Sequence, residues 1–211
     1  MEVVPLKLAN EVAELLSIVG DGRKALPTEL NDYANRLTEL ANQANEGTIT
    51  QEEYDTGMEE TITAMLLLLF LAGTGKESED DLTEEEQAAL AAAIALNLES
   101  VEGLSADIYA GEYRGDDANN LEDRLALWVS VAAGLYFMGQ VMAGGTEVKL
   151  KWRFNPAKEH CSDCARLDGQ VHTAEQWRAS GWIPRDGRLA CKGFRCGCVF
   201  DSTNEAVSGS F

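Results

Sequence analysis

All five cysteines of this 211-residue chain lie in its last 51 residues. They form two groups, Cys161-x-x-Cys164 and, after an interval of 26 residues, Cys191-x4-Cys196-x-Cys198. A Cys-x-x-Cys turn followed by a second cysteine group is typical of a structural zinc site, in which thiolates bind the ion at about 2.3 Å. A segment of this length has too small a core to fold well alone. The cysteines therefore predict a small C-terminal module stabilised by Zn²⁺.

One zinc ion takes four ligands, and the chain offers more than four candidates. The favoured set is Cys161, Cys164, Cys191 and Cys196. Cys198 is the main competitor, because adjacent ligands in Cys-x-Cys are geometrically less usual, and His160 and His172 are further candidates. Disulfides and free thiols are the alternatives to a metal. An odd number of cysteines and no visible export signal indicate a reducing compartment, which favours the metal.

The same site predicts no catalysis, because four thiolates around one zinc ion leave no open coordination position. Zinc deaminases need His-x-Glu, but Glu175 lies three residues after His172. The zincin motif HExxH is absent. A cysteine nucleophile would require a free Cys161 or Cys164 near His172, which competes with the metal site. We therefore expect a protein that is not an enzyme.

Before residue 146 the apolar residues recur at helical spacing. The expected helices are a short one that ends near residues 20–22, one that opens at 26–30, and longer ones over about 51–72, from 84 onward and over about 121–142. Thr50 with Glu53, and Thr83 with Glu86, form capping boxes at two of the helix starts. The apolar run at residues 64–72 is too short to cross a bilayer, so we expect a buried helix and no membrane contact.

After residue 146 the pattern changes. Residues 147–154 alternate as in a β-strand, 173–181 predict a short helix capped by Thr173, and 198–200 a last short strand. The predicted fold is therefore mainly α. It has an acidic helical domain over 1–145, a small α+β zinc-stabilised module over 146–201 and a flexible tail over 202–211.

Charge is unevenly distributed within a formal net charge of −19. Residues 1–145 carry 7 basic and 28 acidic side chains, whereas residues 146–211 carry 10 and 8. DNA affinity needs clustered Lys and Arg, so we do not expect direct nucleic-acid binding. The arginines and aromatic residues after position 150 leave one alternative, a zinc-module nucleic-acid-binding accessory or packaging protein. The competing interpretation, which we favour, places these aromatic rings in the core around the metal.

The order of these features resembles the minor head, or head-morphogenesis, proteins of tailed bacteriophages, the phage Mu F-like family. The matching positions are Cys161, Cys164, Leu167-Asp168-Gly169, Cys191, Cys196 and Cys198. Many members have a histidine where this chain has Cys191. The resemblance implies a non-enzymatic virion protein that acts in head assembly near the portal or the inner capsid surface. It also implies several copies per particle, contacts with capsid, portal or connector proteins, and a location in the virion and, during assembly, in the host cytoplasm.

Overall fold

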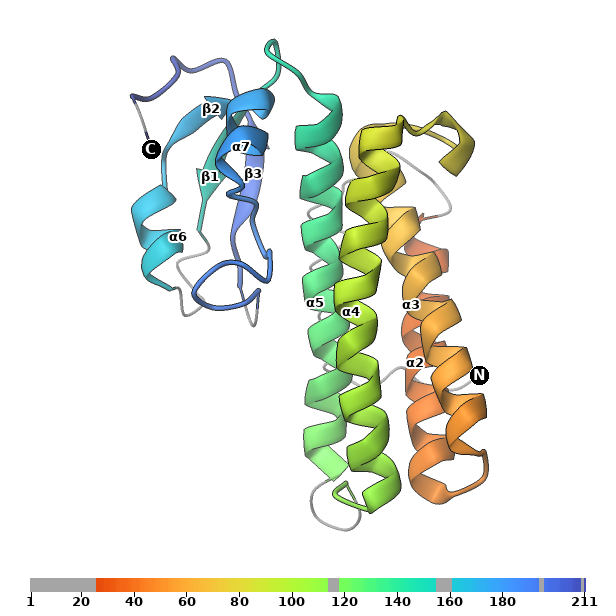
Figure 1. Ribbon diagram of the computed structural model, residues 1–211. Coiled ribbons are helices and arrows are strands. Elements are labelled where there is room, and N and C mark those ends of the chain that lie inside the picture. The colour runs from red at the N-terminus through yellow and green to blue at the C-terminus, as the bar shows by residue number, and fades with distance from the viewer. Residues whose placement is uncertain (1–25, 114–117, 155–160, 194–195, 210) are drawn as a thin grey trace. The chain divides into compact units, whose positions relative to one another are not determined.

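The computed structural model describes residues 26–113, 118–154, 161–193, 196–209 and 211 (Figure 1). In chain order the elements are α2 (Leu26–Glu46), α3 (Gln51–Thr74), the 3-10 helix η1 (Glu79–Asp81), α4 (Glu84–Ala110), α5 (Ala118–Ala143), β1 (Lys149–Arg153), α6 (Ser162–Leu167), β2 (Val171–Thr173), α7 (Ala174–Ser180) and β3 (Val199–Ser202). The predicted mainly helical fold with a small α+β segment at its C-terminal end is confirmed. The helix expected before residues 20–22 lies outside the described residues.

Contacts divide the chain into two compact units. The first consists of residues 1–68 and 88–129, and the second of residues 69–87 and 130–211. The division therefore falls inside α3, α4 and α5, and the second unit contains helix ends together with the cysteine-rich segment. The domain boundary that we expected between residues 145 and 146 stays a prediction.

The first unit is a helical core built on the apolar stripes seen in the sequence. In α2 the predicted stripe is buried at Leu30, Leu37, Leu40 and Ala44. The capping box at the start of α3 is confirmed, because the Thr50 backbone N–H donates to Glu53 Oε2 at 2.7 Å and the Glu53 N–H donates to Thr50 Oγ1 at 3.2 Å. These bonds satisfy amides that a helix start otherwise leaves without partners.

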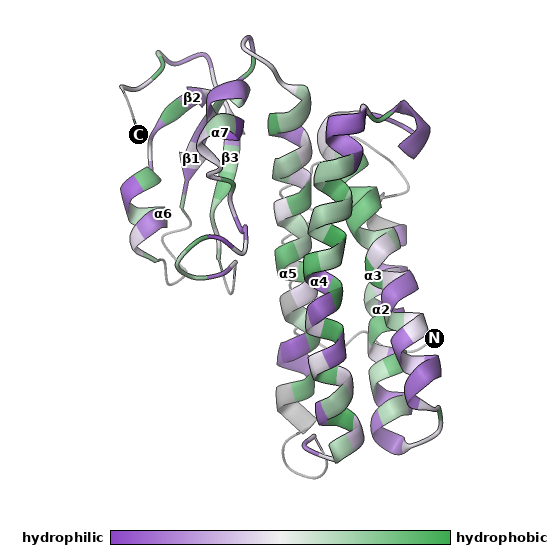
Figure 2. Ribbon diagram, in the orientation of Figure 1, coloured by the Kyte–Doolittle hydropathy of each residue, from purple (hydrophilic) through white to green (hydrophobic). Residues whose placement is uncertain are grey.

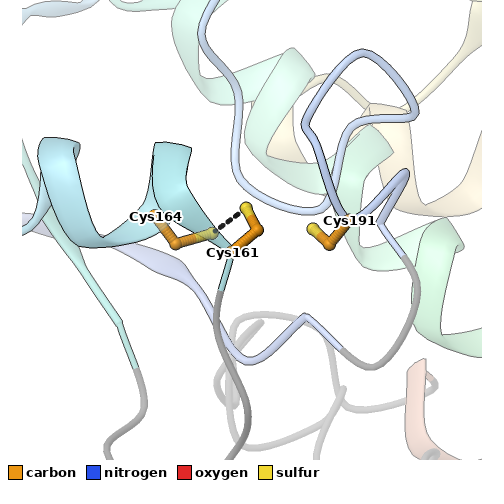
Figure 3. Close-up of side chains that lie close together, drawn as sticks. All are labelled: Cys161, Cys164 and Cys191. Carbon is orange, nitrogen blue, oxygen red and sulfur yellow. Dashed lines mark hydrogen bonds between the residues drawn. The ribbon is translucent and has the colours of Figure 1, made fainter.

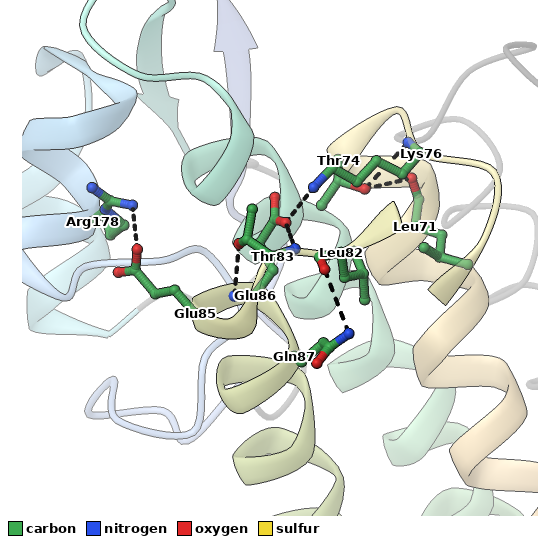
Figure 4. A network of polar contacts seen from close by, with 9 residues as sticks. All are labelled: Leu71, Thr74, Lys76, Leu82, Thr83, Glu85, Glu86, Gln87 and Arg178. Carbon is green, nitrogen blue, oxygen red and sulfur yellow. Dashed lines mark hydrogen bonds and ion pairs between the residues drawn. The ribbon is translucent and has the colours of Figure 1, made fainter. Parts of the chain in front are cut away.

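In the second unit the start of α4 is fixed by a network of polar contacts (Figure 4). The Thr83 N–H donates to Glu86 Oε2 at 2.7 Å, which confirms the second capping box, and Lys76 Nζ binds the same carboxylate. Burial acts to raise the pKa of Glu86, but the bonds from Lys76 and Thr83 outweigh it and lower that pKa. Nearby, Arg178 Nη1 lies 3.4 Å from the exposed Glu85 carboxylate. The acidic first turn of α4 thus has one buried carboxylate, which pairs with Lys76, and one exposed carboxylate, which pairs with Arg178.

The sheet of the second unit has the antiparallel order β2-β1-β3. Register places Trp152 of β1 opposite Phe200 of β3, and Leu150 of β1 opposite His172 of β2. Trp152 and Trp177 are fully buried, with ring centroids 5.7 Å apart, and each packs on Phe200. These rings form the core of the segment, as expected. Because they are buried, they offer no stacking surface for bases.

The tail that we expected to be flexible is held against β2. Val171 and Ser208 exchange two hydrogen bonds, from the Val171 N–H to Ser208 Oγ at 2.9 Å and from the Ser208 N–H to the Val171 carbonyl at 2.8 Å. Lys151 Nζ lies 2.7 Å from a Glu205 carboxylate oxygen. The ring of Phe211 stacks on His172 with centroids 4.0 Å apart. The tail therefore covers an edge of the sheet and part of its aromatic core.

Within the described residues, three helices are long and apolar enough to cross a membrane by length and composition alone, namely Gln51–Thr74, Glu84–Ala110 and Leu121–Ala143. Figure 2 shows apolar residues along all three of these helices. In the first helix the apolar run that we considered too short is part of a longer window of mean hydropathy 1.3, half of which is buried inside the protein. The absence of membrane contact stays a prediction.

Candidate metal centre

The five cysteines come together from two segments of the second unit. Cys161 directly precedes α6 and Cys164 lies in its first turn, whereas the other three lie between α7 and β3. Their sulfur atoms form two overlapping trios, which are Cys161, Cys164 and Cys191 (Figure 3), and Cys164, Cys196 and Cys198. Within each trio all sulfurs lie within 4.8 Å of one another. Cys164 belongs to both trios and is the centre of the cluster.

Two sulfur–sulfur distances in the cluster are near those around a tetrahedral metal ion, whereas the two trios share only Cys164, so four sulfurs would have to draw closer to bind one ion. Cys164 Sγ lies 3.4 Å from Cys161 Sγ and 3.8 Å from Cys196 Sγ. Zinc–sulfur bonds of about 2.3 Å in a tetrahedron place two sulfurs about 3.8 Å apart. Cys164, Cys196 and Cys198 are buried, whereas Cys161 and Cys191 are half-buried. The cluster can hold a metal ion, with one protected side and one side nearer to solvent.

Hydrogen bonds lower the pKa of two of the five thiols, Cys161 and Cys196, and so favour their thiolate form. Burial acts to raise the pKa of Cys161, but contacts with the backbone and sulfur of Cys164, and then of Cys191, lower it overall. Thiol hydrogen bonds from Cys164 and Cys198, followed by the backbone N–H groups of Cys198 and Arg185, lower the pKa of Cys196. The bond that Cys164 donates to Cys196 in turn raises the pKa of Cys164. Thiolate is the form that binds metal.

Tight backbone turns carry the second cysteine group. Gly193 has a φ of 75°, and a Cβ atom on it would collide with the carbonyl oxygen of Arg185. The same carbonyl would lie 3.3 Å from a Cβ on Gly134 in α5. Arg185 itself is buried with a φ of 63°, and its Nε donates to the Cys198 carbonyl at 3.3 Å. Glycine at position 193 is therefore required by both backbone conformation and space.

A carboxylate joins the two cysteine segments. Asp163, between the first two cysteines, accepts a hydrogen bond of 2.8 Å from the backbone N–H of Ala190. Sequence reasoning did not identify Asp163, Arg185 or Trp152 as parts of the site. Asp163 was the only one with a sequence signal, because a short polar side chain inside a Cys-x-x-Cys turn is well placed to accept a backbone N–H.

Trp152 brings a buried N–H group to Cys198. Its indole Nε1 is buried and makes no hydrogen bond of normal geometry, so its interaction with the Cys198 sulfur is a weak one. The Cys164 thiol and, more weakly, the Trp152 indole favour the Cys198 thiolate, but Cys196 and burial outweigh them and raise the pKa of Cys198. Sulfur is thus the acceptor available to this indole. Cys198 was not in the favoured set of four ligands, but it lies on the buried side of the cluster.

The histidines do not complete the cluster in the described part of the chain. His172 is in β2, where its Nε2 lies 3.1 Å from Gln170 Oε1 and its ring packs edge-on against Trp177. It belongs to neither trio and is a packed core residue. His160 lies outside the described residues. The choice of four ligands among the five cysteines stays a prediction.

The chain matches no family model, no curated protein and no solved structure. The likeness to phage head-morphogenesis proteins therefore rests on the residues quoted for it and stays a prediction.

Proposed function

We propose that the five-cysteine cluster binds one structural zinc ion through four thiolates. The observation that carries this proposal is the convergence of five sulfurs on Cys164 from two segments, with neighbours 3.4 and 3.8 Å away. Thiolates select zinc, Cu(I) or iron–sulfur clusters, and a closed set of four thiolates is the usual structural zinc site. The zinc ion would tie α6 to the segment that leads into β3.

We further propose that the protein is a non-enzymatic component of a bacteriophage head, present in several copies and acting through contacts with capsid, portal or connector proteins. The order of the cysteines and the Leu167-Asp168-Gly169 element support this role through their family resemblance. The strongly acidic first 145 residues suit contacts with basic surfaces of other proteins rather than with nucleic acid. A closed metal site contributes stability and no chemistry.

Metal analysis tests the zinc proposal. The purified full chain is expected to contain one zinc ion per chain, measured by elemental mass spectrometry. Cys164→Ser should abolish stoichiometric zinc, because Cys164 belongs to both trios. Ser162→Ala is the matched control, since it changes an exposed residue of the same turn and should retain the metal. A wild-type chain that contains no zinc after expression in zinc-supplemented medium contradicts the proposal.

Particle composition tests the head-assembly proposal separately. Purified proheads and mature virions from the source phage or prophage should contain the chain in fixed stoichiometry when analysed by quantitative mass spectrometry. Absence from both particles would refute this role whether or not the chain binds zinc. The alternative, a nucleic-acid accessory, predicts DNA or RNA binding that weakens steeply with added salt. The burial of Trp152 and Trp177 takes two of the aromatic side chains away from that alternative.

A further inference from the structure

We propose that Cys191 is the thiol that the zinc ion leaves free, and that it makes the metal centre releasable by oxidation. In this mechanism a disulfide between Cys191 and Cys161 removes one ligand, and the metal leaves. The inference rests on the proposed zinc site and adds its regulation.

The buried side of the cluster supplies three of the four ligands. Cys164, Cys196 and Cys198 form a trio in which every member is buried. Cys196 receives backbone N–H groups, and the otherwise unpartnered indole of Trp152 reaches Cys198. Such donors around a metal-bound sulfur stabilise the thiolate and fix its direction. If Cys198 were not a ligand of the ion, the buried Trp152 N–H would have no charged sulfur near it.

The fourth ligand is then Cys161 or Cys191, and the contacts favour Cys161. Cys161 lies in the same turn as Cys164, with the two sulfurs 3.4 Å apart. The backbone groups of both Cys164 and Cys191 donate to the Cys161 sulfur, whereas the sulfur of Cys191 receives a backbone N–H only from Gly193. The backbone of Cys191 thus supports Cys161 as a ligand, while its own thiol stays beside the metal.

Cys191 is placed for disulfide formation with Cys161, although burial raises the pKa of its thiol to about 12 and so slows its reaction. It is half-buried, and its sulfur lies within 4.8 Å of the sulfur of Cys161, the only other half-buried cysteine. Figure 3 shows the Cys191 side chain facing that of Cys161. A small oxidant can therefore reach Cys191 while the three other ligands stay buried, and the neighbouring sulfur is close enough to resolve the product.

The oxidant that we propose is a low-molecular-weight disulfide such as oxidised glutathione. Cys191 loses its proton to solvent and attacks one sulfur of glutathione disulfide, which breaks that S–S bond and releases one glutathione thiolate. The Cys161 thiolate then attacks the Cys191 sulfur of the mixed disulfide and releases the second glutathione thiolate. Two electrons pass from the protein to glutathione, and each departing thiolate takes a proton from solvent. The zinc ion is left with three ligands and binds more weakly.

The test uses the zinc-loaded full chain, excess oxidised glutathione and a chromophoric zinc chelator. We expect one zinc ion to be released for each disulfide formed, peptide mass spectrometry to identify a Cys161–Cys191 bridge, and dithiothreitol to restore binding. Cys191→Ser should retain one zinc ion and release it at least tenfold more slowly. Ser162→Ala should release zinc at the wild-type rate. A Cys161–Cys164 disulfide with Cys191 still reduced would overturn the mechanism.

A second measurement does not depend on variants. Brief alkylation of the zinc-loaded wild-type chain should modify Cys191 and protect the other four cysteines. Modification of another cysteine instead shows that the spare thiol lies elsewhere.

If Cys191→Ser and Cys191→Ala both lose zinc while Ser162→Ala keeps it, Cys191 is a ligand and the inference is wrong, although the zinc site stands. A wild-type chain without zinc defeats the proposed function itself.

Discussion

Gly193→Ala tests how the second cysteine segment is held. Two costs are expected from the structure. The φ of 75° is unfavourable for any residue with a Cβ atom, by about 1–2 kcal/mol. The added Cβ atom would also collide with the Arg185 carbonyl, and such overpacking costs about 1–3 kcal/mol. The free energy of unfolding should therefore fall by about 2–5 kcal/mol in total.

Gly169→Ala is the matched control. Gly169 has a φ of 79°, but no atom lies within 4 Å of the Cβ atom that alanine would add. Only the conformational cost of about 1–2 kcal/mol remains. Urea unfolding of the metal-loaded chain, followed by tryptophan fluorescence, measures both variants, since Trp152 and Trp177 lie in the core of this segment. Equal destabilisation by the two substitutions would refute the close approach of Gly193 to Arg185.

Three further outcomes are expected from urea unfolding. Gly103→Ala should stabilise the chain by about 0.5–1 kcal/mol, since its Cβ atom meets no atom within 4 Å in the interior of α4. Lys76→Met should cost about 1–3 kcal/mol because it takes the ammonium from the buried Glu86 carboxylate, whereas Arg178→Ala, at an exposed ion pair, should cost at most about 1 kcal/mol. Equal costs would contradict this difference. Burial lowers the pKa of His172, so the unfolded state binds its proton more readily. The free energy of unfolding of the wild type should fall as pH drops below about 6.5, and it should fall more than that of His172→Phe. At higher pH the two profiles of unfolding free energy against pH should run parallel.

The long helices could be predicted because their apolar spacing and capping boxes act locally. Thr50 and Thr83 mark the starts of α3 and α4 within a residue or two, and the helix expected over 121–142 is observed as α5, Ala118–Ala143. Gly103 lies inside one continuous helix, since a single glycine costs about 1 kcal/mol and the surrounding residues are strong helix formers.

Among the short elements around the site, β1, α7 with its Thr173 cap and β3 were predicted, whereas α6 and β2 were not. Periodicity needs a window of roughly 11 residues or more, whereas α6 has 6 residues and β2 has 3. Cysteine spacing did predict which side chains would gather. It did not predict that Cys164 would be shared between two trios. That arrangement depends on the left-handed backbone of Arg185 and Gly193 and on the Trp152 indole, none of which the spacing encodes.

The contact between Cys164 and Cys196 also has a topological consequence. Their sulfurs are 3.8 Å apart although the residues are 32 positions apart in the chain. A metal ion that binds both would act as a cross-link around a loop that contains β2 and α7. By the loop-closure relation for cross-linked chains, closing 32 residues lowers the entropy of the unfolded ensemble by an amount worth about 3.7 kcal/mol at 25 °C. This contribution requires that the ion stays bound to both cysteines when the chain unfolds, because only a cross-link that persists in the unfolded chain restricts β2 and α7 there.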